Sequence, residues 1–182
     1  MLLLSMLIAL SGCEKGEEKG IDGETIEGTG FLVTLQAKLP ANIAYDNEEE
    51  PRSVASLADF LGNVTFAVYQ NGQHLHISHQ QSSQSQFGIW QVRLEPGIYQ
   101  LLILAHNGTD HPTVSKPDEI KFANNKITET FYAYLDLEVA SDLSQDIVLE
   151  RAVAKVQYYC KDPIPDNVAQ MKFYYTGGSS TF

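Results

Sequence analysis

The chain has 182 residues and a formal net charge of -11. Its length suits one domain of ordinary size with the start of another, and a hydrophobic content of 43% is enough for a packed core. The acidic surface disfavours nucleic acid and anionic lipid as partners, because both attract proteins through Lys and Arg. Any attachment to a membrane must therefore be covalent or hydrophobic.

An uncharged apolar stretch, LLLSMLIAL, occupies residues 2–10. It is too short for a membrane-spanning helix, which needs about 20 apolar residues, and it has the length of the apolar region of a secretory signal. The sequence then reads as a lipobox, formed by Leu10, Ser11, Gly12 and Cys13. We predict that residues 1–12 are a lipoprotein signal peptide and that Cys13 carries the lipid, since several acyl chains on one residue make a lasting anchor.

The segment that follows, EKGEEKGIDGETIEGTG, contains six acids, two lysines and five glycines. Such a composition cannot bury enough apolar surface to fold, so we predict that residues 13–28 form a flexible acidic tether. The second cysteine, Cys160, lies in an apolar strand-like run. We expect it to be a buried thiol and expect no disulfide with Cys13.

From residue 29 onward apolar residues recur with a period of two, which predicts strands. GFLVTLQAKL at residues 30–39 is the first such strand. NVTFAVYQNGQHLHIS at residues 63–78 predicts a hairpin, because Asn71-Gly72 supplies the positive φ of a tight turn. FGIWQVRLEPGIYQLLILAHN at residues 87–107 predicts a second hairpin, with Pro96-Gly97 in a type II turn.

Further strands are predicted at residues 127–139, 146–160 and 168–177. A short helix is predicted at residues 53–61, capped by Ser53 or Ser56. Many short strands separated by turns predict an all-β fold, an antiparallel β-sandwich. We place the first sandwich at residues 29–146. Residues 147–182 resemble the opening strands of a second β-sandwich, which we expect to be incomplete because the sequence stops at Phe182.

The histidines were considered as metal or catalytic residues. His74 and His76 share a strand face, but no local Cys or carboxylate completes a metal site, so we interpret them as a solvated strand face. His106 and His111 lie around a loop with an Asp, and we expect His106 to satisfy loop carbonyls near the end of a sheet. The sequence contains no nucleophile elbow and no phosphate-binding loop. We therefore expect no enzyme, no catalytic residue, no cofactor and no metal.

Several stretches, taken in order, resemble one known family: LSGC, SLADFLGNVTFAVYQNGQ, FGIWQVRLEPGIYQLLILAHN, ITETFYAYLDLEV, LERAVAKVQ and IPDNVAQMKFYYTGGSSTF. They are similar to the FimB-type minor fimbrial subunits of type V pili, which are lipoproteins of Bacteroidetes. The acidic patch after Cys13 also resembles the surface-export signal of Bacteroidetes lipoproteins. The resemblance implies two transthyretin-like sandwich domains of Greek-key type in tandem.

The resemblance also implies a function. A subunit of this family anchors a fimbrial shaft to the outer membrane or regulates its assembly, with pilin subunits as partners. It does so by strand addition, in which a sheet edge accepts an extended segment of the next subunit. Residues 20–31 contain no Lys or Arg at which a maturation protease would remove the lipid, which fits a subunit that stays anchored and exposed at the cell surface.

Two other functions compete with this interpretation. The first is a surface lipoprotein that binds glycans for nutrient uptake, with Trp90 or Tyr99 stacking on a sugar. The alternation of the strands places both aromatic residues equally well in the core, which we favour. The second is an esterase or protease that uses His106 or His111. Neither requires a nucleic-acid partner, and the leading interpretation requires no small-molecule substrate.

Overall fold

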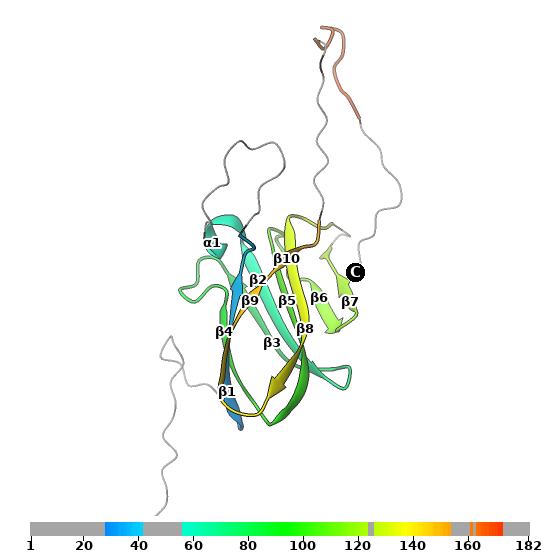
Figure 1. The fold of residues 1–182 in the computed structure, drawn as a ribbon. Coiled ribbons are helices and arrows are strands. Elements are labelled where there is room, and N and C mark those ends of the chain that lie inside the picture. Colours follow the sequence, from blue (N-terminus) through cyan, green and yellow to red (C-terminus); the bar gives the residue numbers. More distant parts are fainter. Residues whose placement is uncertain (1–27, 42–55, 124–125, 154–160, 162, 173–182) are drawn as a thin grey trace, which may run out of the picture.

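The fold was examined in a computed structural model, which describes residues 28–41, 56–123, 126–153, 161 and 163–172. Two sheets pack as a sandwich, and a separate hairpin lies beside the larger one (Figure 1). The smaller sheet has the order β4 (Ile89–Leu94), β1 (Phe31–Lys38), β9 (Leu143–Val148). The larger has the order β10 (Glu150–Arg151), β8 (Thr130–Val139), β5 (Gly97–His106), β2 (Asn63–Gln70), β3 (Gln73–Gln81). The hairpin joins β6 (Thr113–Lys116) to β7 (Glu119–Lys121).

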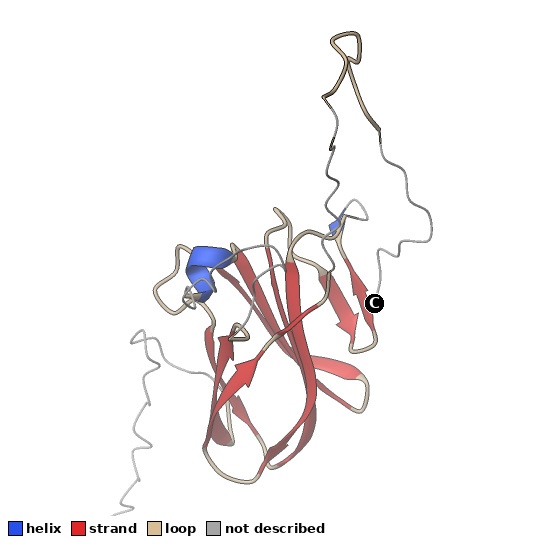
Figure 2. Cartoon of the chain, turned by 45° about the horizontal axis from the view of Figure 1, so that its top comes forward, coloured by secondary structure: helices blue, strands red, loops and turns tan. Residues whose placement is uncertain are grey.

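These sheets confirm the predicted all-β sandwich. Figure 2 shows how little of the described chain is helical: the one α-helix is α1 (Leu57–Phe60). Of the two predicted caps, Ser56 is the N-cap and forms a capping box with Asp59, whereas Ser53 lies outside the described residues. No helix among the described residues is long and apolar enough to cross a membrane.

The main core lies between the two sheets. It is built from the residues that the period of two places on one face of each strand, such as Val33 and Leu35 of β1 and Leu101 and Ile103 of β5. All four of these side chains are fully buried. The hydrophobic effect at this interface is therefore what holds the two layers together.

A second, smaller core covers the outer face of the larger sheet. Val114, Ile120 and Phe122 of the β6–β7 hairpin pack on Tyr69 and Leu102 of the sheet. This contact explains why β2 and β5 carry apolar residues on both faces. Sequence patterns gave no indication that the short segment at residues 113–122 would cover β5.

The β2–β3 hairpin is confirmed. Asn71 has φ 54° and Gly72 has φ 75°, as a two-residue turn with both central residues in the left-handed region requires. The register shifts between Val68 and Tyr69, so the edge strand β3 carries a bulge.

The second predicted hairpin is wrong. β4 and β5 are consecutive and joined by two residues, but β4 pairs with β1 in the smaller sheet while β5 pairs with β2 and β8 in the larger one. The connection crosses from one layer to the other, and Gly97 lacks the positive φ of a type II turn. Tyr99 donates a hydrogen bond to the carbonyl of Glu95 (2.7 Å) across this crossing. The period of two shows only which face of a strand is buried. It is the same whether two consecutive strands pair in one sheet or lie in opposite sheets.

The predicted boundary after residue 146 is also wrong in position. β9 continues to Val148 in parallel pairing with β1, with Ile147 opposite Ala37. Leu149 is fully buried in the same core, and Arg151 pairs with Phe131 of β8. The first sandwich therefore includes residues 147–151, and one pair of an otherwise antiparallel sandwich is parallel. The predicted second domain stays a prediction, because the described residues 163–172 form no strand and residues 173–182 lie outside the described part.

Shortening the chain tests this corrected boundary. A chain ending at Asp146 lacks Ile147 and Leu149, which are 5% and 0% exposed, whereas a chain ending at Val153 retains both. Losing one large buried aliphatic side chain costs about 2–5 kcal/mol. We expect the shorter chain to unfold at a clearly lower urea concentration than the longer one, or not to fold. Equal unfolding midpoints for the two chains would restore the boundary after residue 146.

Candidate functional site

The predicted lipid site lies outside the described residues. Leu10, Ser11, Gly12 and Cys13 therefore remain a prediction from the sequence, as does the tether at residues 13–28, of which only Gly28 is described. The described residues offer a different candidate site, at one open side of the sandwich.

The outer edge of β8 is unpaired over most of its length. β5 pairs with the whole inner edge, from Thr130 to Val139. On the outer edge, β10 covers only Phe131 and Tyr132. No other described strand pairs with β8 there, so residues 133–139 form a seven-residue stretch of unpaired edge.

The direction of the main-chain groups on this edge follows from one hydrogen bond. The Ala152 amide donates to the Thr130 carbonyl (2.9 Å), so the polar groups of Thr130 point away from β5. In an antiparallel ladder this direction alternates residue by residue. The amides and carbonyls of Tyr134, Asp136 and Glu138 therefore point out of the sheet. An added strand could bond to all three residues without disturbing the β5–β8 ladder.

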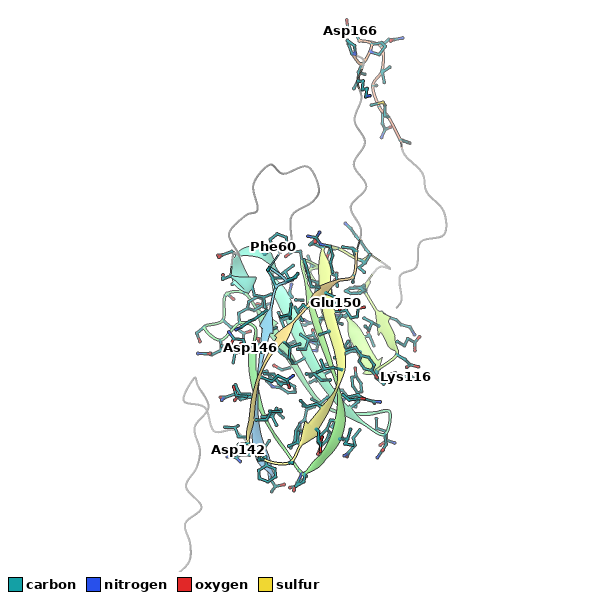
Figure 3. All side chains as sticks on the ribbon, in the orientation of Figure 1. Phe60, Lys116, Asp142, Asp146, Glu150 and Asp166 are labelled. Carbon is teal, nitrogen blue, oxygen red and sulfur yellow. The ribbon has the colours of Figure 1, made fainter. Side chains whose placement is uncertain are left out.

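The edge of the opposite sheet lies across from β8. β9 pairs with β1 on one side only. The Leu149 amide donates to the Lys38 carbonyl (2.8 Å), so the alternate residues Ser144, Asp146 and Val148 direct their main-chain groups outward. In Figure 3, Asp142, Asp146 and Glu150 follow one another along this side of the molecule, where the chain passes from β9 to β10.

A cavity of about 230 Å³ lies between these two edges. Its lining consists of Tyr132, Ala133, Tyr134, Leu135, Ile147, Val148 and Glu150. Ala133 and Ile147 belong to the main core and Leu135 packs against it, so the cavity opens onto core side chains. Tyr134 and Val148 remain 48% and 58% exposed at its margins. Core side chains that remain accessible between two unpaired edges are an arrangement that an extended segment can fill.

On the other side of the sandwich, one side chain links the two edges. Gln80 of β3 donates through Nε2 to the Ile89 carbonyl (2.6 Å) and accepts from the Gly88 amide at Oε1 (2.8 Å). This amide bridges the larger sheet to the start of β4. Together with the bulge in β3, it makes that edge a poor template for another strand.

The histidines form a small cluster at one end of the larger sheet. The rings of His79 and His111 stack with centroids 4.2 Å apart. His79 Nδ1 lies 2.9 Å from Thr65 Oγ1. Burial first, and then the neighbouring histidines His111 and His74, lower the pKa of His79. Within the described part of the chain, no group of three His, Cys, Asp or Glu side chains is placed to hold a metal ion.

His106 is fully buried, and its hydrogen-bond partner differs from the expected one. Its Nδ1 accepts a hydrogen bond from the Gly108 amide (3.0 Å), so it satisfies an amide and not a loop carbonyl. Its ring packs edge-on against Phe122, at 85° between planes. Burial, and then the nearby His111 and His79, lower the pKa of His106 to about 4. His74 and His76 are exposed on β3, as a solvated strand would have them.

The two aromatic residues considered for sugar binding belong to the main core. Tyr99 is 4% exposed and holds the β4–β5 crossing. Trp90 is half-buried and packs against Phe66 with ring centroids 5.6 Å apart. The preference for core positions is confirmed, and neither ring offers a flat exposed platform.

The sequence did not identify the open edge. The strand predicted at residues 127–139 is observed as β8, but hydrophobic periodicity carries no information about which strand becomes an edge. The predicted strand at residues 146–160 contains the charged pair Glu150-Arg151, which forms the two-residue strand that covers one end of β8.

The protein was also compared with known proteins. No protein-family model matches the sequence, and no curated protein matches it. The fold aligns with a Bacteroides thetaiotaomicron protein provisionally described as polysaccharide-binding, at 17% identity and TM-score 0.48, over 66% of this chain and 47% of the other.

Two further solved structures align with it. A provisionally assigned adhesin of Bacteroides thetaiotaomicron matches at 15% identity and TM-score 0.45, over 68% of this chain and 46% of the other. One from Bacteroides ovatus matches at 11% and TM-score 0.41, over 70% and 50%. The chain thus spans about half the length of each, and identities and scores this low imply no shared function.

The buried His106 predicts a loss of stability in acid. Because its folded pKa of about 4 lies below the usual 6.5, the unfolded chain binds the proton first, and stability falls as pH drops from about 6.5 towards 4. At pH 5 the cost from this one group is about 2 kcal/mol. Urea unfolding at pH 7 and pH 5 measures it. His106→Gln, which keeps an acceptor for the Gly108 amide, should reduce the difference between the two pH values, whereas the exposed His76→Gln should not. An unchanged difference in His106→Gln would contradict this assignment.

Proposed function

We propose that this protein is a lipid-anchored subunit of a fimbria at the bacterial outer membrane, which anchors the shaft or regulates its assembly by accepting a strand from a pilin. The observation that carries the proposal is the seven-residue unpaired edge of β8 beside a cavity that reaches core side chains. A binding surface of this kind uses main-chain hydrogen bonds for affinity and alternate side chains for selectivity.

The energetics of such an edge favour a partner. Each of the outward-facing residues Tyr134, Asp136 and Glu138 can exchange up to two main-chain hydrogen bonds with an added strand, each contributing about 0.5–1.5 kcal/mol net. The same strand would cover Leu135 and the margin of Ile147, which the cavity leaves open. The donor segment would thus complete a core that the described chain leaves accessible on this side.

The anchor would be the lipid on Cys13, followed by the acidic tether of residues 13–28. Surface exposure of the sandwich, with the tether spanning the distance to the membrane, would present the edge of β8 to pilin subunits. Glycan binding through Trp90 or Tyr99 is not favoured, because both rings pack in the core.

A proline tests the acceptor edge. The Asp136 amide points out of the sheet, so Asp136→Pro removes a donor that only an added strand would use and leaves the bonds to β5 in place. We expect Asp136→Pro to lose co-purification with the fimbrial shaft from cells while its urea midpoint changes little. Asp136→Ala, which keeps the amide, is the matched control and should still co-purify. Shaft capture by Asp136→Pro at the level of the unaltered protein would remove β8 as the acceptor.

The lipid anchor has its own test. Cys13→Ala removes the thiol that would carry the diacylglycerol, so the protein should leave the membrane fraction and appear in the soluble fraction of the envelope. Fractionation of cells followed by immunoblotting measures this, with Cys160→Ala as the control that should stay bound. Retention of Cys13→Ala in the membrane would show that Cys13 is not the anchor.

A further inference from the structure

The outward face of the open edge carries acids without partners. Tyr134, Asp136 and Glu138 follow one another on this face of β8, and all three are exposed. Within the part of the chain that the structure describes, neither carboxylate takes part in an ion pair or hydrogen bond. Some other described acids do have a basic partner: Asp146 contacts Lys38, and Glu129 contacts Arg151.

The sheet itself leaves these two charges uncompensated. In the β5–β8 ladder, Asp136 lies opposite Gln100 and Glu138 lies opposite Ile98, so neither faces a cation across the inner edge. The remaining cross-strand position of each acid lies on the outer edge, which β10 does not reach. Cross-strand pairs of opposite charge stabilise a sheet, and like charges directly opposite each other destabilise it.

From this juxtaposition, and resting on the strand addition proposed above, we propose that the edge selects a donor segment in which apolar residues alternate with basic ones. Its apolar side chains lie on the core face, beside Leu135 and over the cavity. Its Lys or Arg side chains lie on the outer face, opposite Asp136 and Glu138. The pattern follows because Asp136 and Glu138 direct their main-chain groups to the open edge, so the residues paired with them would lie on the same face as their acidic side chains.

The same charges disfavour a second copy of this chain as the occupant. Pairing of two β8 edges would bring the carboxylates of one copy against those of the other, with no cation on either edge to separate them. Acids on an exposed edge are a recognised means of preventing self-association of sheets. The acids therefore disfavour pairing between two copies of this edge and leave the edge available to a basic strand.

Two synthetic peptides test the proposal on the full chain. Both have seven residues in which Val alternates with a charged residue, Lys in one and Glu in the other, and each carries a fluorophore. By fluorescence anisotropy at low salt, we expect the Lys peptide to bind about tenfold more tightly, with the difference shrinking at high salt because the pairs are exposed to solvent.

Variants test whether Asp136 and Glu138 cause the preference for the Lys peptide. Asp136→Asn with Glu138→Gln should remove it, and Asp136→Lys with Glu138→Lys should reverse it. The matched control is Asp118→Asn with Glu119→Gln on the β6–β7 hairpin, which makes the same change in net charge away from the edge and should leave the preference intact. If this control also removes the preference, the net charge of the protein and not the edge is responsible, and the proposal is overturned.

The remaining outcomes separate the charge preference from strand addition. Equal binding of both peptides, lost from both in Asp136→Pro, would overturn the basic pattern and leave strand addition standing. Binding of neither peptide, at any salt concentration, would overturn both at this edge. A concentration-dependent dimer in sedimentation, abolished by Asp136→Pro, would show that a second copy occupies the edge and would likewise overturn the basic donor.

Discussion

Strand β5 hydrogen-bonds to β2 along one edge and to β8 along the other, and it is buried on both faces. The rest of the molecule is arranged around this need to pair and cover the strand. The smaller sheet covers its inner face, where Leu101 and Ile103 lie, and the β6–β7 hairpin covers its outer face at Leu102 and Leu104. The amides and carbonyls of the central strand are paired on both sides. The unpaired main-chain groups lie at the margins, because every open sheet has two edges.

The unpaired edges differ between the two sides of the sandwich. On one side the Gln80 side chain bridges β3 to β4, and a bulge interrupts β3. On the other, a two-residue β10 covers only the end of β8, and the chain leaves a cavity over Leu135 and Ile147. This asymmetry is the structural basis of the proposed function: on one side the Gln80 side chain links the two edges, and on the other main-chain groups and core side chains remain accessible to a partner. The exposed acids of the open edge add a means of choosing that partner.

Sequence patterns predicted local features well wherever the cause was local. Asn71-Gly72 forms the predicted turn, Ser56 caps its helix, and alternation predicted the strands observed as β1 and β8. The errors share one physical origin. The crossing from β4 to β5 and the extension of β9 past residue 146 both concern which sheet a strand joins, and alternation is identical in either sheet. The open edge was missed for the same reason, as was the role of residues 113–122 as a cover.

By itself, then, the sequence determined the class of the fold, the buried face of most strands, and the turns in which a residue must adopt positive φ. It also predicts a lipobox at Cys13 and an acidic tether, because these features depend on composition and position along the chain. The tertiary structure alone decided which strands became edges, which edge stayed open, and that Asp136 and Glu138 stand beside an empty strand position. Those features depend on hydrogen bonds between segments far apart in the sequence, and no local pattern of side chains records which segments those will be.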